Sequence, residues 1–176
     1  MGSKTVFLSH RRDPTGKAFA RAIAQELKHR GYDGFLDVDG LEFGPWPHQL
    51  REQVAARAHF LLLLTPGALE KCADAEDWVR REYELAVHHR RNLVPVRNED
   101  FDTDAERARC PAAMGGVFDL QIATVSHAGF EGDVEELVRR FIPPHKAPGW
   151  RGPATPGASP RKGEGETGGS RLPGAD

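Results

Sequence analysis

Trp78 and Glu82 are the two residues whose types and spacing point most directly to chemistry. They stand four residues apart in the segment DWVRRE, so on a helix they share one face near its N-terminal end. An aromatic ring beside a carboxylate suits cleavage of a cationic N-glycoside, such as the nicotinamide–ribose bond of NAD+. The leaving group is already cationic and needs no general acid, while one carboxylate can hold the ribose hydroxyls and stabilise the positive charge that grows on the sugar. In isolation the spacing is also common by chance, with Trp78 in the core and Glu82 on the surface.

Two adjacent arginines follow the first apolar segment of the chain. Arg11 and Arg12 lie in the segment SHRRDP, between an expected strand and an expected helix. A guanidinium group can hold two phosphate oxygens at once, and the N-terminus of a helix adds amide donors. The alternative is that both arginines are solvated loop charges that pair with Asp13 or Asp39.

The segment from Asp37 to Pro47, DVDGLEFGPWP, is too long for an ordinary connection between a strand and a helix, which takes about 2 to 6 residues. Long loops that carry aromatic residues are often functional. Phe43 and Trp46 could stack on a flat ring, and Gly40 and Gly44 could act as hinges. The alternative is a loop that packs its aromatic side chains back onto the domain.

These segments belong to a chain in which apolar runs alternate with helical patterns. Strands are predicted at Thr5–Ser9, Gly34–Asp37, His59–Leu64, Asn92–Val96 and near Val117–Gln121, and helices at Thr15–Arg30, Pro47–Arg57, Ala75–His89, Thr103–Ala113 and Phe130–Ile142. The run HFLLLL is continuously apolar, which is typical of a parallel strand covered on both faces. The pattern predicts an α/β fold: a flavodoxin-like, doubly wound, five-stranded parallel sheet with helices on both faces. Ligands bind such sheets at the carboxyl ends of the strands.

Composition narrows the class of protein. The formal charge is only -2, from 24 basic and 26 acidic side chains, which disfavours nucleic acid and anionic membranes as partners. Cys72 and Cys110 are expected to be reduced thiols, and no signal or membrane segment is recognisable, so a cytoplasmic location is expected. Residues 1–142 are predicted to form one domain, and residues 143–176, rich in Pro, Gly and Ser, a disordered tail.

Other kinds of site find little support. His88 and His89 are adjacent and point to different sides of their helix, so no metal site is predicted. No phosphate-binding or dinucleotide-binding glycine motif follows a strand. A phosphoacceptor receiver domain could use Asp37 and Asp39, but it requires an aspartate at the end of the central strand, where this chain has Leu64-Thr65-Pro66.

In order and at their separations, the segments FLSHRR, FLDVDGLEFG, HFLLLLTPGAL, DWVRRE and NLVPV resemble those of the TIR domain family, specifically its NAD-cleaving members. The resemblance covers Thr5 to Ile142. It implies that Glu82 is the catalytic glutamate and that Asp37 to Trp46 forms the BB loop of the family. The residues that it implies contact substrate are His10, Arg11, Asp37, Glu42, Phe43, Trp46 and Trp78.

The chain departs from the family pattern at three places. His10 stands where a tyrosine is common, and Gly40 stands where a lysine is often found. Pro45 and Pro47 make the loop stiffer than usual because proline fixes its own φ angle. These departures bear on loop dynamics and substrate affinity more than on the chemistry.

The resemblance implies an NAD+ glycohydrolase that releases nicotinamide together with ADP-ribose or, where it acts as a cyclase, with a cyclic ADP-ribose isomer. NAD+ is then the substrate and no cofactor is expected. The family commonly completes its site between two copies through the BB loop, so a homo-oligomer that acts as a defence or cell-death effector is expected, with a separate sensor protein as a further candidate partner. The alternative is a non-enzymatic TIR adaptor, a class that frequently lacks the glutamate.

Overall fold

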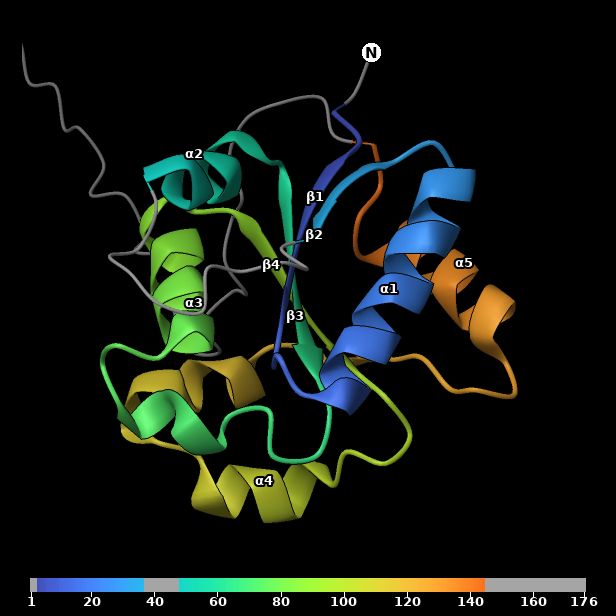
Figure 1. Ribbon diagram of the computed structural model, residues 1–176. Helices are drawn as coiled ribbons and strands as arrows, with labels where there is room; N and C mark the ends of the chain where they lie inside the picture. Colours follow the sequence, from blue (N-terminus) through green and yellow to red (C-terminus); the bar gives the residue numbers. More distant parts are fainter. Residues whose placement is uncertain (1–2, 37–47, 145–176) are drawn as a thin grey trace, which may run out of the picture.

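Five parallel strands form a sheet between two layers of helices in the computed structural model, which describes residues 3–36 and 48–144 (Figure 1). The strand order is β2-β1-β3-β4-β5, and every neighbouring pair is parallel. The elements are β1 (Thr5–His10), α1 (Pro14–His29), β2 (Asp33–Leu36), α2 (His48–Ala56), β3 (His59–Leu64), the 3-10 helix η1 (Glu70–Ala73), α3 (Trp78–His88), β4 (Asn92–Arg97), α4 (Thr103–Arg109), the 3-10 helix η2 (Ala112–Asp119), β5 (Ala123–Thr124) and α5 (Phe130–Arg140). The predicted doubly wound α/β fold is confirmed.

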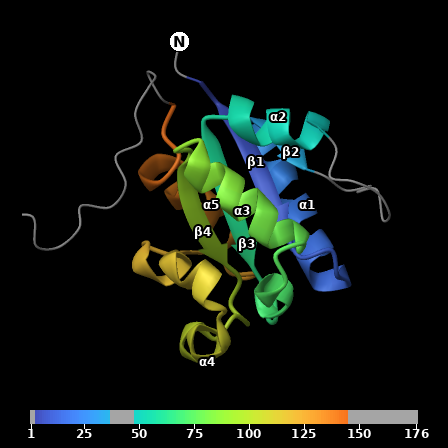
Figure 2. The ribbon, with the colours of Figure 1, turned by 90° about the vertical axis from the view of Figure 1, so that its left-hand side faces the viewer.

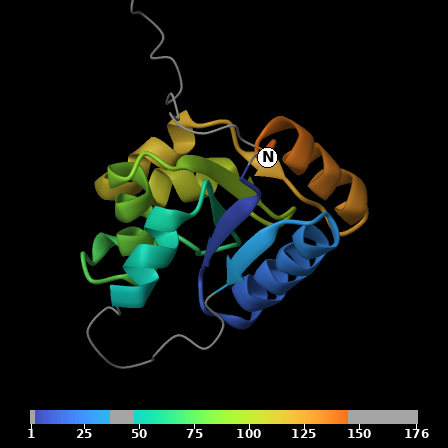
Figure 3. The same ribbon diagram turned by 90° about the horizontal axis from the view of Figure 1, so that it is seen from above.

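The central strand β3 shows why the sheet needs helices on both faces. All six of its residues are buried, so it has no solvent-facing side. Successive side chains point to opposite faces: Leu61 and Leu63 join the core on the α1 and α5 side, whereas Phe60 and Leu62 join the core on the α2 and α3 side. Figure 3 shows the sheet between these two helical layers, and Figure 2 shows α2 and α3 side by side along one face.

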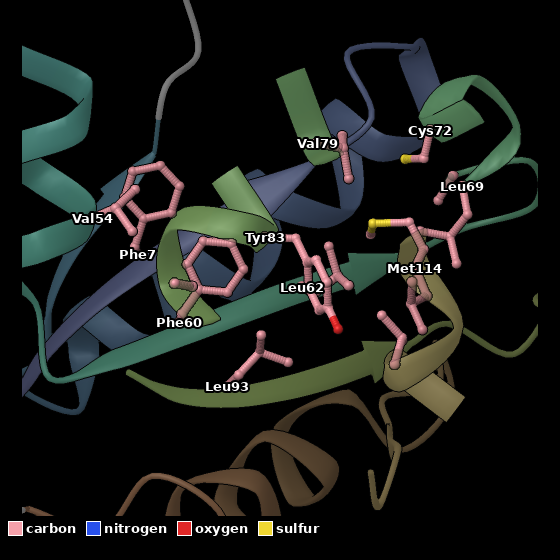
Figure 4. Close-up of a cluster of buried hydrophobic side chains, with 14 of the residues drawn as sticks. Phe7, Val54, Phe60, Leu62, Leu69, Cys72, Val79, Tyr83, Leu93 and Met114 are labelled. Carbon is pink, nitrogen blue, oxygen red and sulfur yellow. The ribbon is translucent and has the colours of Figure 1, made fainter. Parts of the chain in front are cut away.

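The core beneath α3 consists largely of aromatic and aliphatic side chains (Figure 4). Phe7 stacks on Phe60 with ring centroids 5.4 Å apart. Tyr83 extends from α3 toward β3, and Met114 reaches the same cluster from η2. This packing fixes the height and rotation of α3 over the sheet, and therefore the place of every residue on its inner side.

The first loop is held tightly against the start of α1. Asp13 caps the helix by accepting a hydrogen bond from the backbone amide of Gly16 at 2.6 Å, and Pro14 occupies the first turn, where no amide donor is needed. A Cβ atom at position 16 would lie only 2.0 Å from the carbonyl oxygen of Arg11. Glycine is therefore required for the loop to approach the helix so closely.

Helix α3 begins at Trp78, three residues later than the predicted start at Ala75. Asp77 is the N-cap, and its side chain accepts a hydrogen bond from the backbone amide of Arg80 at 3.2 Å. The residues before it form η1, a separate turn of 3-10 helix. Trp78 thus occupies the first position of the helix.

The predicted strand near Val117–Gln121 is wrong. Those residues lie mostly in η2, and the fifth strand is the two-residue Ala123–Thr124. Met114 and Val117 are both fully buried and stand three residues apart, which is the repeat of a 3-10 helix rather than the two-residue repeat of a strand. The predicted helix Thr103–Ala113 also ends early, at Arg109, shortly before Pro111.

Candidate functional site

A cavity of about 440 Å³ opens at the carboxyl ends of β1 and β3. This is the edge at which open parallel sheets bind their ligands. The cavity is lined by His10, Arg11, Arg12, Asp13, Pro66, Gly67, Glu70, Lys71, Asp77, Trp78 and Val79. The first loop, the loop after β3 and the start of α3 therefore meet around one space.

Glu82 lies one helical turn beyond Trp78 on the inner side of α3. It is only 5% exposed, among the buried residues Val79, Tyr83 and Ala86 of the same helix. A buried carboxylate is costly unless it accepts hydrogen bonds. Ser9, the penultimate residue of β1, supplies one: its Oγ donates to Glu82 Oε2 at 2.5 Å. This burial excludes the interpretation of Glu82 as an ordinary surface residue.

Arg11 makes its contacts within the protein. Its Nη1 donates to Asp77 Oδ2 at 2.5 Å and its Nη2 to Asp77 Oδ1 at 3.2 Å. Nε and Nη2 also donate to the carbonyl oxygen of Ala68, at 3.0 and 2.7 Å. The side chains of Arg11 and Asp77 are 13% and 8% exposed, so this is a nearly buried, two-pronged ion pair. It ties the first loop to the N-terminus of α3.

The charges of this pair reinforce each other. Burial by itself would raise the pKa of Asp77, but hydrogen bonds and charge from Arg11 bring that pKa below its ordinary value. Burial likewise opposes the charge of Arg11, yet Asp77 raises the pKa of the guanidinium above its ordinary value. Both groups therefore stay ionised at neutral pH, and the start of α3 is held by a charge-assisted contact.

Cys72 completes the cluster behind the ion pair. Its Sγ lies 3.3 Å from Asp77 Oδ1 and 3.5 Å from Arg11 Nη2. Burial, followed by the charge of Asp77, raises the pKa of this thiol to about 12. Cys72 and Cys110 are both free thiols. Cys72 is protonated at neutral pH and acts here as a buried structural side chain.

Trp78 is half-buried at the mouth of the cavity. The Arg12 guanidinium carbon lies 4.5 Å from the centroid of the Trp78 ring, in a cation–π contact. One arginine of the first loop is therefore engaged with Asp77 and the other with Trp78. Sequence reasoning placed both arginines near a ligand but did not find these two partners.

The structure brings together several of the residues predicted for the site. His10, Arg11 and Trp78 line the same cavity, and Glu82 lies one turn further along α3. The other predicted contacts lie outside the described residues: Asp37, Glu42, Phe43 and Trp46. The elements on either side of that loop are well placed. Leu36, the last residue of β2, pairs with Leu8, and α2 packs along α3.

Ser9 and Asp77 hold Glu82 and Arg11 in place, and sequence reasoning missed both. A serine at the end of an otherwise apolar strand, TVFLSH, was the available indication for Ser9. For Asp77, the indication was an aspartate directly before a helical pattern, where N-caps occur. In each case the partner is more than 60 residues away along the chain.

Within residues 3–36 and 48–144, no three His, Cys, Asp or Glu side chains gather as metal ligands would. No helix in those same ranges has both the length and the apolar content needed to cross a membrane.

Three relatives from animals are similar to this chain in sequence. The NAD(+) hydrolase tir-1 of Caenorhabditis elegans is 36% identical over 109 residues, which cover 60% of this chain and 11% of that protein. The NAD(+) hydrolase sarm1 of Drosophila melanogaster is 36% identical over 137 residues, covering 76% and 10%. The NAD(+) hydrolase SARM1 of Danio rerio is 31% identical over 137 residues, covering 76% and 19%. The matched region therefore spans only a tenth to a fifth of these relatives.

Solved structures with the same fold include the TIR domains of the activated Roq1 resistosome that recognises the pathogen effector XopQ. The TM-score is 0.56 at 17% identity, over 77% of this chain and 97% of that one. The TIR-STING receptor from C. gigas in complex with 2',3'-cGAMP gives a TM-score of 0.50 at 18% identity, over 74% and 38%. At these identities the likeness concerns the fold alone.

The family model described as TIR domain matches residues 6–138. That range contains the five strands of the sheet except for Thr5 at the start of β1, together with the first loop and the whole of α3. Together with the relatives and the fold, it shows that this chain belongs to the TIR domain family.

Proposed function

We propose that this chain is an NAD+ glycohydrolase in which Glu82 is the catalytic residue. The observation that carries the proposal is the carboxylate of Glu82, which is buried and hydrogen-bonded to Ser9 one turn beyond Trp78 and the cavity at the sheet edge. The three animal relatives named NAD(+) hydrolase support the same activity.

The proposed reaction breaks the bond between C1′ of the ribose and the nicotinamide nitrogen. The bonding electrons leave with nicotinamide, which becomes neutral, and positive charge develops on the ribose. The Glu82 carboxylate accepts hydrogen bonds from the ribose hydroxyls and stabilises that charge. Water then adds to C1′, so NAD+ and water give nicotinamide, ADP-ribose and one proton. Attack on C1′ by a nucleophile within the same ADP-ribose, in place of water, would give a cyclic ADP-ribose isomer.

The remaining site residues are assigned to substrate binding. Trp78 offers an aromatic face to the substrate, and His10 and Arg12 line the same cavity. The Arg12 guanidinium supplies positive charge suited to the diphosphate. Arg11 belongs to the site as well, but its contacts with Asp77 and Ala68 make it a support for the cavity wall. From the loop, Asp37, Glu42, Phe43 and Trp46 are proposed to contact substrate.

Self-association is part of the proposal. β2 ends at Leu36, at the carboxyl edge of the sheet and directly before the loop Asp37–Trp46 in the sequence. In the proposed active form, this loop lies against the next copy of the chain. The Roq1 TIR domains belong to an assembly, the activated resistosome, which is consistent with activity that depends on association. A role as a defence or cell-death effector in the cytoplasm, alongside a separate sensor, completes the proposal.

The test is nicotinamide release from NAD+ by wild type, Glu82→Gln and Glu84→Gln over a range of protein concentrations. Glu84 lies on the same helix, but it is 49% exposed and paired with Arg80 at 2.8 Å, so it controls for the loss of one glutamate charge. We expect Glu82→Gln to lower kcat at least about 100-fold, because the electrostatic contribution to the transition state is lost. Glu84→Gln should retain wild-type activity, and specific activity should rise with concentration.

Two outcomes would overturn the proposal. Equal activity in wild type and Glu82→Gln would remove Glu82 from the chemistry. Absence of nicotinamide release from a wild type that associates into oligomers would favour the non-enzymatic adaptor. Mass spectrometry of the products would separate ADP-ribose from a cyclic isomer.

A further inference from the structure

The interface between β1 and α3 is apolar except at one point. On this side of the sheet the strands contribute Phe7, Phe60, Leu62, Leu64 and Leu93. Ser9 stands two residues after Phe7 on β1, so its side chain points to the same face. A serine therefore occupies a position in a row that is otherwise filled by large apolar side chains.

Helix α3 has the matching exception. Its buried residues are Val79, Glu82, Tyr83 and Ala86, and Glu82 is the charged one. The two polar exceptions face each other: Ser9 Oγ donates to Glu82 Oε2 at 2.5 Å, with Ser9 1% and Glu82 5% exposed. Two apolar residues at these positions would stabilise the interface more simply, because they would avoid the cost of burying a carboxylate.

We propose that Ser9 is the positioning residue of Glu82, holding its carboxylate in one orientation between β1 and α3 and favouring its ionised form. This inference rests on the proposed function. A carboxylate has about four lone-pair sites, so the hydrogen bond from Ser9 leaves capacity for the two ribose hydroxyls. Because Ser9 lies on a central strand paired on both sides, it is a rigid anchor for a side chain that has three rotatable bonds.

The physical consequence is a dependence on pH as well as on geometry. A donor to the ionised carboxylate stabilises that form, so its removal favours protonation. The acidic limb of the pH profile of kcat should therefore move to higher pH in Ser9→Ala. At neutral pH, kcat should fall roughly 10- to 100-fold, because misplacing a reacting group by about 1 Å can cost about 100-fold.

Tyr32→Phe is the matched control for Ser9→Ala. Tyr32 is 4% exposed and its hydroxyl donates to the carbonyl oxygen of Ile142 at 2.6 Å, at the opposite end of the sheet. Each variant removes one buried hydroxyl and its hydrogen bond. If Ser9 were only a structural residue, the two variants would lose stability and leave the pH profile in place.

The experiment compares kcat, KM, melting temperature and pH profile for wild type, Ser9→Ala, Ser9→Thr and Tyr32→Phe. We expect a fall in kcat and a shifted acidic limb in Ser9→Ala alone, with recovery in Ser9→Thr, which keeps a hydroxyl. In a Glu82→Gln background, Ser9→Ala should cause no further loss, because Ser9 acts through Glu82. An unshifted limb in Ser9→Ala, or equal losses of kcat in Ser9→Ala and Tyr32→Phe, would overturn the proposal.

A second measurement separates this inference from the proposed function. In protein labelled with carboxyl-13C glutamate, the Glu82 resonance is identified by its absence in Glu82→Gln and followed through a pH titration. In Ser9→Ala it should titrate at higher pH than in wild type, whether or not the protein cleaves NAD+. Inactive wild type with that shift would overturn the NAD+ glycohydrolase assignment alone, and active wild type without it would overturn the role of Ser9.

Discussion

The two ends of the parallel sheet use buried polar side chains for different purposes. At the amino end, Asn92 Nδ2 donates to the carbonyl oxygen of Phe141 at 2.7 Å and to His59 Nδ1 at 2.8 Å. The Tyr32 hydroxyl donates to the carbonyl oxygen of Ile142 at 2.6 Å. These contacts attach the segment after α5 to the start of the sheet. These hydrogen bonds join secondary-structure elements to one another and contribute to the stability of the fold.

At the carboxyl end, buried polar groups lie at and next to open space. Arg11 and Asp77 line the cavity of about 440 Å³, and Ser9 and Glu82 join β1 to α3 within one helical turn of it. A second cavity, of about 580 Å³, opens at the same edge between α1 and the loops after β4 and β5. Hydrogen bonds of similar length thus shape a functional edge at this end of the sheet and connect two segments of the chain at the other. Changes at the amino end should affect stability alone, whereas changes at the carboxyl end should affect both stability and activity.

The largest effect on stability is expected from Asp77→Ala. This change leaves Arg11 nearly buried without its carboxylate and removes the N-cap of α3, and breaking a buried pair costs about 3 to 5 kcal/mol. The melting temperature should fall by roughly 10 °C, at about 2 to 4 °C per kcal/mol for a domain of this size. Activity should also fall, because losing the N-cap disturbs the start of α3, where the next residue, Trp78, lines the cavity. Thermal unfolding and nicotinamide release measure the two effects.

The double variant Arg11→Met/Asp77→Leu controls for the loss of the ion pair itself. Apolar residues in place of both partners leave no charge unpaired, so much of the stability should return. Activity should stay low, because the cap and the wall of the cavity are still altered. A single Asp77→Ala variant as stable as wild type would contradict the role assigned to this ion pair.

Asn92→Ala tests the amino end of the sheet, where a change should affect stability and leave activity in place. It removes two hydrogen bonds and leaves the carbonyl of Phe141 without this donor, at a cost of about 1 to 3 kcal/mol. We expect a lower midpoint in urea unfolding and an unchanged kcat at temperatures where the variant is folded. A fall in kcat without any loss of stability would show that the two ends are coupled.

Much of the fold could be predicted from the sequence because the central strands are buried on both faces. The apolar runs TVFLS, HFLLLL and NLVPV give β1, β3 and β4 to within one residue of each end. The weakest signal was β5, which contributes only Ala123–Thr124. A two-residue strand carries no detectable periodicity, so the pattern of apolar residues could not locate it.

The site could be predicted in part. The helical spacing of Trp78 and Glu82 follows from local geometry, and both residues lie on α3 as expected. The partners of Arg11 and Glu82 could not be predicted, because Asp77 and Ser9 lie 66 and 73 residues away along the chain. The sequence offers Asp13 as a nearby partner for the arginines, but in the structure the Asp13 side chain caps α1.

A smaller effect concerns stability in acid. The pKa of Asp77 lies below its ordinary value of 3.8: burial raises it, and the hydrogen bonds and charge of Arg11, with hydrogen bonds from Cys72 and the Arg80 amide, together lower it by more. A depressed carboxyl pKa contributes stability that is fully present above the pKa of the unfolded chain and is lost as the pH falls toward the folded pKa. Wild type should therefore lose stability below about pH 4 more steeply than Asp77→Asn. Urea unfolding between pH 2 and 6 measures the two slopes, and parallel curves would contradict the assignment.

The smallest expected effect is on the reactivity of Cys72, despite its place beside the cavity. An adjacent arginine usually favours a thiolate, but burial and the charge of Asp77 outweigh Arg11 and raise the pKa of Cys72 to about 12. At pH 8 only about one molecule in ten thousand then carries the thiolate. Alkylation of native protein, read by mass spectrometry, should modify the half-buried Cys110 first. In Asp77→Asn the opposing charge is gone and Arg11 remains, so Cys72 should react faster; an unchanged rate would show that burial alone protects it.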